Sequence, residues 1–245
     1  MKSNSPKDEI FALPLNETSH FVFDEHVATV FNDMIKRSVP GYEAIVSMIG
    51  VLAEQYARDD SCCYDLGCST GAVTLVMRHR IQKNNCKIIS VDNSSAMVAR
   101  CTENVKNDRG NIPVEIICSD IQDIVLENAS VVSLNFTLQF VAPEKRIDVL
   151  ENIYQAMVPG GILVLSEKIS FKDKEEEQFQ INMHHNFKKI NGYSDLEISQ
   201  KRTALENVLI PETLETHLDR LGAVGFKQVY VWFQSFNFVS IIAIK

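Results

Sequence analysis

The chain has 245 residues, of which 45% are hydrophobic, and its 24 basic and 32 acidic side chains give a formal net charge of −8. This length is enough for one sizeable core, and the acidic balance argues against direct binding of a polyanion such as nucleic acid. No run of about 18 apolar residues occurs, so we expect no membrane-spanning helix. We expect a single domain over residues 1–245, with residues 1–58 as an N-terminal arm and helices and residues 171–215 as a helical insertion.

The six cysteines lie at positions 62, 63, 68, 86, 101 and 118, without a C-x-x-C pair and without an evident secretory leader. This pattern predicts reduced, buried thiols and a cytoplasmic protein. Cys68 lies in the glycine-containing loop discussed below, where a packing or backbone role is favoured over nucleophilic catalysis.

The N-terminal third is expected to form an arm followed by two helices. Aromatic and apolar residues around Pro14 predict an arm that orders against the rest of the protein, with disorder in only the first few residues. Between positions 24 and 58, apolar side chains recur at helical spacing on both sides of a break at Pro40-Gly41. We therefore expect two helices before the first strand.

Residues 62–71, CCYDLGCSTG, predict a buried strand, a glycine turn and a helix that begins near Ala72. Gly67 and Gly71 permit backbone conformations closed to other residues, and the first turn of the helix offers unpaired N–H groups. The segment therefore predicts a nucleotide ligand at the carboxyl end of this strand.

Three hypotheses compete for this loop. Gly67 to Gly71 match the G-x-S-x-G nucleophile elbow of serine hydrolases, but the loop follows the first convincing strand, and the only late histidines are at 184, 185 and 217. A dinucleotide-binding loop would need a middle glycine that is missing, which disfavours NAD, although a nicotinamide enzyme remains the runner-up. The third hypothesis is the S-adenosylmethionine loop of class I methyltransferases.

Acidic residues near the ends of the next strands favour the third hypothesis. The strand predicted at 87–92 ends in Asp92, which can accept both ribose hydroxyls, and Asn93, Ser94 and Ser95 are helix-capping types. The strand at 114–118 leads to Asp120 and Ile121, which can contact the amino group and the ring of adenine. With Asp65, three acidic strand tips are expected around one S-adenosylmethionine or a close analogue.

The remaining pattern completes the predicted sheet. A strand at 130–135 ends at Asn135, a candidate polar contact to the methionine end of the ligand, and no Asn/Asp-Pro-Pro-aromatic motif follows, which weakens DNA or protein amine methylation. A helix from Pro143 to about Met157, a turn at 159–161, a strand at 162–167 and β-rich runs at 228–233 and 236–244 follow. We predict an α/β, Rossmann-like class I methyltransferase fold, with a seven-stranded, mainly parallel sheet, a terminal antiparallel hairpin and extra N-terminal and inserted helices.

Within the predicted insertion, the charge run at 172–177 is typical of a solvated helix start. His184 and His185 would point about 100° apart on a helix, so no metal site is predicted. Lys201 and Arg202 are unremarkable from their spacing alone.

Several segments together make the chain resemble one family over nearly its whole length. The chain is similar to the carboxy-S-adenosyl-L-methionine synthases at VFDE (22–25), RSVPGY (37–42), DLGCSTG (65–71), DNS (92–94), KR (201–202), LENV (205–208) and WFQSFNF (232–238). The loop at 65–71 is common to many methyltransferases, whereas RSVPGY and WFQSFNF are far more restrictive.

The resemblance implies an enzyme that converts S-adenosyl-L-methionine and prephenate to carboxy-S-adenosyl-L-methionine and phenylpyruvate. A partner tRNA carboxymethyltransferase would pass the carboxymethyl group to 5-hydroxyuridine at the tRNA wobble position, forming 5-oxyacetyluridine. The resemblance also implies a cytoplasmic homodimer. This enzyme would release a small molecule for the partner enzyme and would not need to bind tRNA itself.

By position, the resemblance implies that Arg202 holds the new carboxylate, in its own or a neighbouring subunit's site. The implied cofactor-binding residues are Tyr42, Gly67, Cys68, Ser69, Asp92, Asn93, Asp120, Ile121, Asn135 and Arg202. Two alternatives stay open from the sequence: an ordinary small-molecule methyltransferase that uses S-adenosylmethionine, and a catalytically silent binding module.

Overall fold

The computed structural model describes residues 6–13, 21–206 and 208–245. Pro14 and most of the predicted arm around it lie outside these ranges, as do the first residues for which disorder is predicted. In the described part of the arm, Phe11 and Phe21 are buried against α1 (Glu25–Ser38), whereas Leu13 is exposed. The arm therefore packs on the first helix through its aromatic side chains.

One mainly parallel sheet organises the fold, in the order β3-β2-β1-β4-β5-β8-β7. Neighbouring strands from β3 to β5 are parallel, and β8 is antiparallel to both β5 and β7. The strands are β1 (Cys62–Leu66), β2 (Lys87–Asp92), β3 (Val114–Cys118), β4 (Ala129–Asn135), β5 (Met157–Ser170), β7 (Gln228–Ser235) and β8 (Phe238–Ile244). This confirms the predicted Rossmann-like fold with its terminal antiparallel hairpin.

The sheet has eight strands where seven were predicted, because the two-residue β6 (Glu212–Thr213) pairs with the end of β5. The turn predicted at Pro159–Gly161 lies inside β5, which is extended from Met157 to Ser170. There the pairing with β4 jumps from Met157 to Ile162, and Gly160 has a φ of 73°. The glycines therefore form an irregularity within one strand instead of a turn before it.

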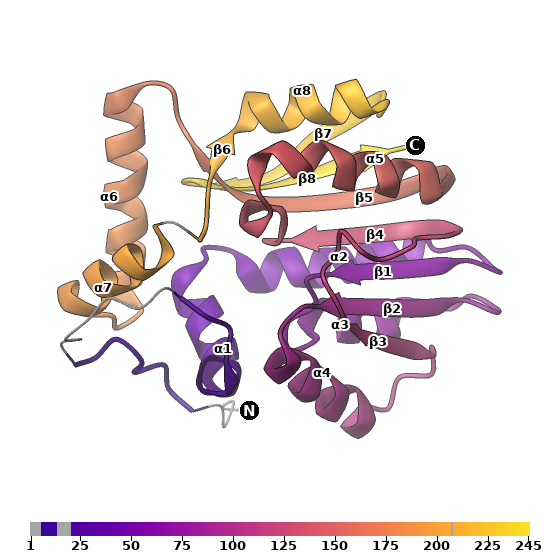
Figure 1. Cartoon of the computed structure of the whole chain (residues 1–245), viewed down its shortest axis with the longest axis horizontal. Coiled ribbons are helices and arrows are strands. Elements are labelled where there is room, and N and C mark those ends of the chain that lie inside the picture. Colours follow the sequence, from indigo (N-terminus) through magenta and orange to yellow (C-terminus); the bar gives the residue numbers. More distant parts are fainter. Residues whose placement is uncertain (1–5, 14–20, 207) are drawn as a thin grey trace.

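Helices cover both faces of the sheet (Figure 1). Successive strand side chains point to opposite faces, so that Cys63 packs with α2 (Tyr42–Tyr56) and α3 (Ala72–Arg80), and Tyr64 packs with α5 (Arg146–Ala156) and α8 (Leu214–Val224). The predicted helices at 24–58 and near 72 are confirmed. The α8 helix, most of which lies beyond the predicted insertion, was not predicted.

Three further helices lie near the carboxyl ends of the parallel strands (Figure 1). They are α1, which packs on α4 (Ser95–Asn107), and the inserted helices α6 (Lys174–Ile190) and α7 (Asp195–Leu205). The 3-10 turns η1 (Leu138–Phe140) and η2 (Pro143–Lys145) follow β4. Within the ranges described, no helix is both long and apolar enough to cross a membrane.

The sequence predicts capping residues that the structure contains. Ser94 accepts from the Met97 N–H at the start of α4, and Asp173 accepts from the Glu175 and Glu176 N–H groups at the start of α6. The acidic run therefore begins a helix, as predicted.

Candidate functional site

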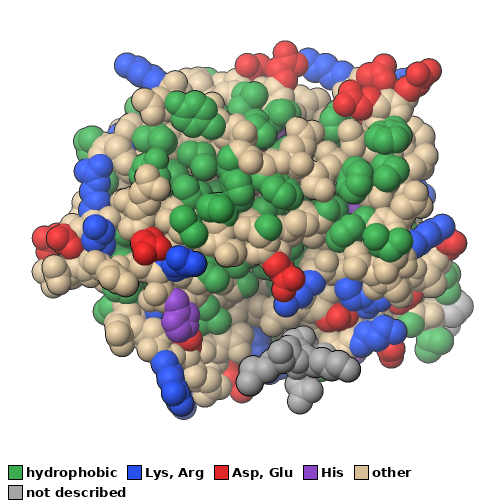
Figure 2. Space-filling model, turned by 180° about the vertical axis from the view of Figure 1, so that it is seen from behind, with side chains coloured by type: hydrophobic (Ala, Val, Ile, Leu, Met, Phe, Trp, Pro, Cys, Tyr) green, Lys and Arg blue, Asp and Glu red, His purple; other side chains and the backbone are tan. Residues whose placement is uncertain are grey.

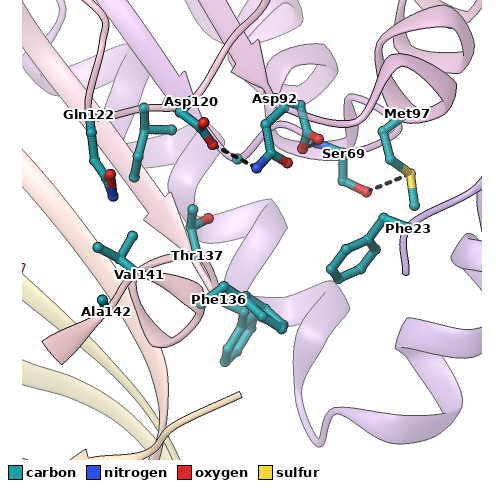
Figure 3. A pocket seen from close by; sticks show the side chains of 14 residues that line it. Phe23, Ser69, Asp92, Met97, Asp120, Gln122, Phe136, Thr137, Val141 and Ala142 are labelled. Carbon is teal, nitrogen blue, oxygen red and sulfur yellow. Dashed lines mark hydrogen bonds between the residues drawn. The ribbon is translucent and has the colours of Figure 1, made fainter. Parts of the chain in front are cut away.

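A cavity of about 190 Å³ opens at the carboxyl ends of β1, β2 and β4 (Figure 3). It is lined by Phe23, Gly67, Ser69, Asp92, Asn93, Met97, Asp120, Ile121, Gln122, Phe136, Thr137, Phe140, Val141 and Ala142. Six of the predicted site residues therefore meet in one place, which we call the acidic cavity. Figure 3 shows its acidic and amide side chains on one side and the aromatic rings on the other.

The turn after β1 is closely packed against the residues that follow β4. Gly67 has a φ of 81°, and a Cβ atom at this position would lie 2.2 Å from Thr137 Oγ1. Thr137 Oγ1 donates to the Leu66 carbonyl at 2.8 Å. This position therefore requires glycine both for its backbone conformation and for the space beside Thr137.

Asp92 is held at the tip of β2 by backbone donors. Its carboxylate accepts from the N–H groups of Ser69 and Ser94, each at 2.9 Å. Burial raises the pKa of Asp92, and these two hydrogen bonds oppose the shift. The arrangement leaves a carboxylate fixed in place at the cavity wall, suited to accept from a pair of hydroxyl groups.

Asp120, beyond β3, is tied to the same wall. The Asn93 side-chain amide donates to Asp120 Oδ1 at 2.7 Å (Figure 3). Met97 closes the floor, where Ser69 Oγ donates to its sulfur at 3.5 Å. The acidic cavity thus combines polar acceptors with apolar surface, as a nucleoside requires.

Asp65 does not line the acidic cavity, in contrast to the predicted ring of three acids. Its carboxylate accepts from the Thr74 N–H at 2.9 Å and from Thr74 Oγ1 at 2.6 Å, within the first turn of α3. Asp65 is the fourth residue of β1, so its side chain points, like that of Cys63, to the face of the sheet covered by α2 and α3 and not to the strand tip. Burial raises its pKa to about 6.

Cys68 contributes its backbone to the loop, but its buried thiol faces Cys101 of α4 and not the cavity. The contact with Cys101, together with burial, raises the pKa of the Cys68 thiol, so it is a poor nucleophile. The prediction of buried cysteines fails at Cys118, which is exposed, and at Cys62, which is half-buried at the start of β1.

Two other predicted residues lie beside the acidic cavity without lining it. Tyr42 begins α2, and its ring lies 6.4 Å from that of Phe136. Asn135 ends β4, and its Oδ1 is buried without a hydrogen-bond partner among the described residues. Asn135 Oδ1 is therefore free to accept a hydrogen bond from a donor outside the described residues.

Arg202 lines a second cavity, of about 680 Å³, between the sheet and helices α1, α6 and α7. We call it the basic cavity, because Lys168, His184, His185, Lys188, Lys201 and Arg202 line it together with a largely apolar wall. The two cavities share Phe23, Phe136 and Phe140. They are therefore neighbours, separated by aromatic rings that belong to both.

His184 and His185, which are adjacent on α6, both line the basic cavity. His184 Nε2 donates to the Ser38 carbonyl at 2.8 Å, and burial lowers the pKa of its ring. Within residues 6–13, 21–206 and 208–245, no group of three or more histidine, cysteine or acidic side chains is arranged to hold a metal ion.

Sequence comparison decides the family. A model described as "Methyltransferase domain" matches residues 64–161. Over 239 residues, the chain is 57% identical to the carboxy-S-adenosyl-L-methionine synthase of Geobacter sp. strain M21, covering 97% of this chain and 98% of that protein. The chain belongs to the carboxy-S-adenosyl-L-methionine synthase family. The synthase from Shewanella halifaxensis is 53% identical, covering 99% of this chain and 100% of its own length. The synthase from Vibrio cholerae is 55% identical, covering 98% of each chain.

Solved structures support the fold of the synthase family member. A putative S-adenosyl-L-methionine-dependent methyltransferase from Methanococcus maripaludis matches with a TM-score of 0.57 at 19% identity, covering 95% of this chain and 97% of its own. Human N-acetylserotonin methyltransferase, solved in complex with SAM, matches with a TM-score of 0.61 at 17% identity, covering 97% of this chain and 61% of its own. At these identities the likeness shows the fold alone.

Sequence reasoning did not assign several cavity residues. Thr137 and Phe140 follow the strand predicted at 130–135 without a motif that indicates a site, and Phe23 stands in the VFDE segment without an assigned role. Nothing in the sequence indicates a site at Lys188 or Lys168, because these residues reach the basic cavity from two different elements, α6 and β5.

Proposed function

We propose that this synthase family member converts S-adenosyl-L-methionine and prephenate to carboxy-S-adenosyl-L-methionine and phenylpyruvate. The main support for the proposal is that the acidic cavity and the basic cavity are neighbours in a chain that belongs to the carboxy-S-adenosyl-L-methionine synthase family. The acidic cavity suits an adenosine, and the basic cavity beside it suits a carboxylated substrate. An ordinary methyl transfer would not by itself require such a collection of cations.

In the acidic cavity, Asp92 would accept from the ribose hydroxyls, and Asp120 with Ile121 would contact adenine. The backbone of Gly67, Cys68 and Ser69, with Asn93, would border the nucleoside, and Tyr42 and Asn135 would lie toward the methionine end. These assignments rest on the cavity lining, on the fixed Asp92 carboxylate and on the unpaired Asn135 Oδ1.

Arg202 would bind the carboxylate newly formed on the product. A guanidinium presents a planar fork of donors that can form two charge-assisted hydrogen bonds to one carboxylate. Arg202 has an exposed side chain at the rim of the basic cavity, so a ligand can reach it.

The proposed chemistry needs no strong general base from the protein. Prephenate aromatises to phenylpyruvate by losing carbon dioxide and hydroxide, and the hydroxide removes one proton from the sulfonium methyl group to form water. The resulting ylide carbon then bonds to carbon dioxide, giving the carboxymethyl group. The protein would hold the two substrates together and keep water out until this bond forms.

We propose that two copies of the chain form a homodimer. Seen from behind the sheet, hydrophobic side chains gather across one face of the molecule (Figure 2). The exposed apolar side chains include Met48 of α2, 40% exposed, and Tyr230 and Val231 of β7, 55% and 40% exposed. Sedimentation velocity of the protein and of a Val231→Glu variant tests this, since a charge in the contact should dissociate the dimer.

We further propose that the product serves a separate tRNA carboxymethyltransferase in the cytoplasm. The formal net charge of −8 supports a role that does not include direct binding of tRNA. The cysteines, which are all free, fit a reducing compartment.

The function is tested by measuring stoichiometry. Purified protein is incubated with S-adenosylmethionine and prephenate, and both phenylpyruvate and the nucleoside products are quantified over time. The proposal predicts one phenylpyruvate per carboxy-S-adenosylmethionine, and no adenosylhomocysteine. Adenosylhomocysteine as the main product would instead establish ordinary methyl transfer, and unchanged S-adenosylmethionine would establish passive binding.

A further inference from the structure

Lys188 is a buried cation without an anionic partner. Its side chain projects from α6 into the basic cavity, and the residue is 7% exposed. Among the residues described, its ammonium makes no hydrogen bond or ion pair, and the charges that act on it are those of Lys201, Lys168 and Arg202. An unpaired buried charge opposes folding, so its presence in a cavity indicates a site for an anion.

The other charged groups around the cavity do not neutralise Lys188. Lys201 donates to Ser38 Oγ and lies 3.8 Å from the Asp8 carboxylate, so it already has its own partners. Glu177, on α6, acts on Lys168 but accepts from the Phe171 N–H at 2.7 Å, and it makes no ion pair with Lys168 within 4.0 Å.

Three further groups complete the titratable lining of the basic cavity. Glu206 is exposed at the end of α7, and His184 and His185 lie on α6. Burial and nearby cations lower the pKa of both histidines. The cavity therefore keeps an excess of positive charge around Lys188 and Lys168.

Most of the remaining wall is apolar and partly aromatic. It includes Phe21, Phe31, Met34, Ile35, Ile181 and Phe238, in addition to the three rings shared with the acidic cavity. A volume of about 680 Å³ exceeds what a simple inorganic anion needs. Cations set in an apolar wall therefore favour a compact carboxylic acid that carries a hydrocarbon ring.

We propose that the basic cavity binds the dicarboxylate substrate, and that Lys188 and Lys168 hold the carboxylate that survives the reaction. This inference rests on the proposed function, in which prephenate loses its ring carboxylate and keeps its pyruvyl carboxylate. The ring then lies against the shared aromatic side chains, next to the acidic cavity and the sulfonium methyl group.

The assignment to the surviving carboxylate follows from the energetics of decarboxylation. An ion pair to the departing carboxylate would stabilise the ground state more than the transition state, because the negative charge leaves that group as carbon dioxide forms. An ion pair to the pyruvyl carboxylate is unchanged throughout the reaction and supplies uniform binding and orientation. Arg202 remains available for the carboxylate of the product.

Binding at this site is coupled to proton uptake. Burial, together with Lys201, Lys168 and Arg202, lowers the pKa of Lys188 to about 7. At pH 8 this amine is therefore mostly neutral in the free protein. A carboxylate beside it favours the charged form and raises its pKa, so that binding at pH 8 takes up a proton.

The test compares Lys188→Met and Lys168→Met with Lys189→Met, all in the full-length protein. Lys189 follows Lys188 on α6 but is exposed and paired with Asp195, so it is a matched control. Prephenate binding is measured by calorimetry on protein saturated with S-adenosylhomocysteine, which has no sulfonium methyl group and therefore cannot react with prephenate. We expect the dissociation constant to rise about thirtyfold or more for both cavity variants, to stay within twofold for the control, and S-adenosylmethionine affinity to be unchanged.

Two readouts separate this role from a structural one. In buffers of different ionisation enthalpy at pH 8, wild type should take up a proton on binding prephenate, and Lys188→Met should not. Lys188→Met should also melt no lower than wild type, because it removes a buried amine that has neither a hydrogen-bond partner nor an anionic partner among the described residues.

Phenylpyruvate, which keeps only the surviving carboxylate, identifies the group that is held. Its inhibition constant should rise in parallel with the prephenate dissociation constant in both variants. If phenylpyruvate inhibition were unchanged while prephenate binding weakened, the assignment to the surviving carboxylate would be overturned. Wild-type prephenate affinity in both variants would overturn the site but leave the proposed function standing, whereas a wild type that neither binds nor turns over prephenate overturns both.

Discussion

Lys201 and Arg202 are adjacent on α7 but have different surroundings. Lys201 is 6% exposed, and its ammonium donates to Ser38 Oγ at 2.9 Å and lies 3.8 Å from Asp8 Oδ2. Arg202 is exposed and lines the basic cavity. The buried contacts of Lys201 join α7 to α1 and to the N-terminal arm, and so they position the neighbouring guanidinium.

We therefore expect Asp8→Asn to destabilise the protein by about 3 kcal/mol, because it leaves Lys201 buried without its nearest carboxylate. It also weakens the acceptor for the Tyr193 hydroxyl. The control is Asp195→Asn, which removes an exposed ion pair with Lys189 and should cost less than about 1 kcal/mol. Urea unfolding measures both, and equal losses in the two variants would contradict the anchoring role of Asp8.

Arg202→Ala should weaken binding of carboxy-S-adenosylmethionine by about tenfold or more, with little effect on S-adenosylmethionine, because only the product carries the additional carboxylate. Arg202→Lys should recover part of the loss, since an ammonium supplies charge without the planar fork. Calorimetric titration with the two nucleosides measures this. The control is Arg80→Ala, which removes an exposed pair with Glu54.

An equal loss of affinity for both nucleosides would show that Arg202 acts on the fold or on the shared part of the ligand. Mixing Arg202→Ala with a variant that is inactive because of a change in the acidic cavity, such as Asp92→Asn, then shows whether Arg202 acts in the site of its own subunit or in that of a neighbouring subunit. Recovered turnover in the mixture indicates that Arg202 reaches a neighbouring subunit.

Gly67→Ala should abolish S-adenosylmethionine binding or lower it at least about tenfold, because the new Cβ would meet Thr137 Oγ1 and the φ of 81° is strained for alanine. Gly222→Ala is the control, since nothing lies within 4 Å of a Cβ placed there in α8. That change should preserve binding and stabilise the protein by a few tenths of a kcal/mol to about 1 kcal/mol. Wild-type ligand affinity in Gly67→Ala would contradict the close approach seen in the turn.

The buried carboxyl of Asp65 gives a pH dependence of known sign. Burial raises its pKa from 3.8 to about 6, so its contribution favours folding below pH 4 and is lost as the pH rises through about 6. Relative to Asp65→Asn, the wild-type free energy of unfolding should fall by about 3 kcal/mol over this interval. Urea unfolding of both proteins from pH 4 to pH 7 measures the difference, and a difference independent of pH would contradict the raised pKa.

The local patterns of the first half predict most of the fold and the acidic cavity. These patterns are the glycines at 67 and 71, the acids at 92 and 120, and the capping residue types after β2, and each can be recognised from a few neighbouring residues. The structure brings the glycine loop and both acids to one edge of the sheet. Asp65 was assigned to the same edge wrongly. Asp65 lies inside a strand whose side chains alternate between the two faces, nine residues before Thr74 in the following helix. This position indicates that its carboxylate faces the helix.

The basic cavity could not be predicted from local patterns. Lys168, Lys188 and Arg202 come from β5, α6 and α7, and only the tertiary arrangement of these three elements brings their side chains to one cavity. In sequence, Lys188 is one of two adjacent helical lysines, and nothing in the spacing shows that it is buried while Lys189 is exposed. Cavities built from distant segments depend on tertiary packing that periodicity does not encode.

The central claim is that the carboxyl carbon of prephenate is transferred to the methyl group of S-adenosylmethionine. The most direct measurement uses trideuteromethyl S-adenosylmethionine and prephenate labelled with carbon-13 in its ring carboxylate, with mass spectrometry of the nucleoside product. The account predicts carboxy-S-adenosylmethionine that retains two deuterium atoms and contains the labelled carbon. A product without the label, or adenosylhomocysteine with the trideuteromethyl group transferred elsewhere, would contradict it.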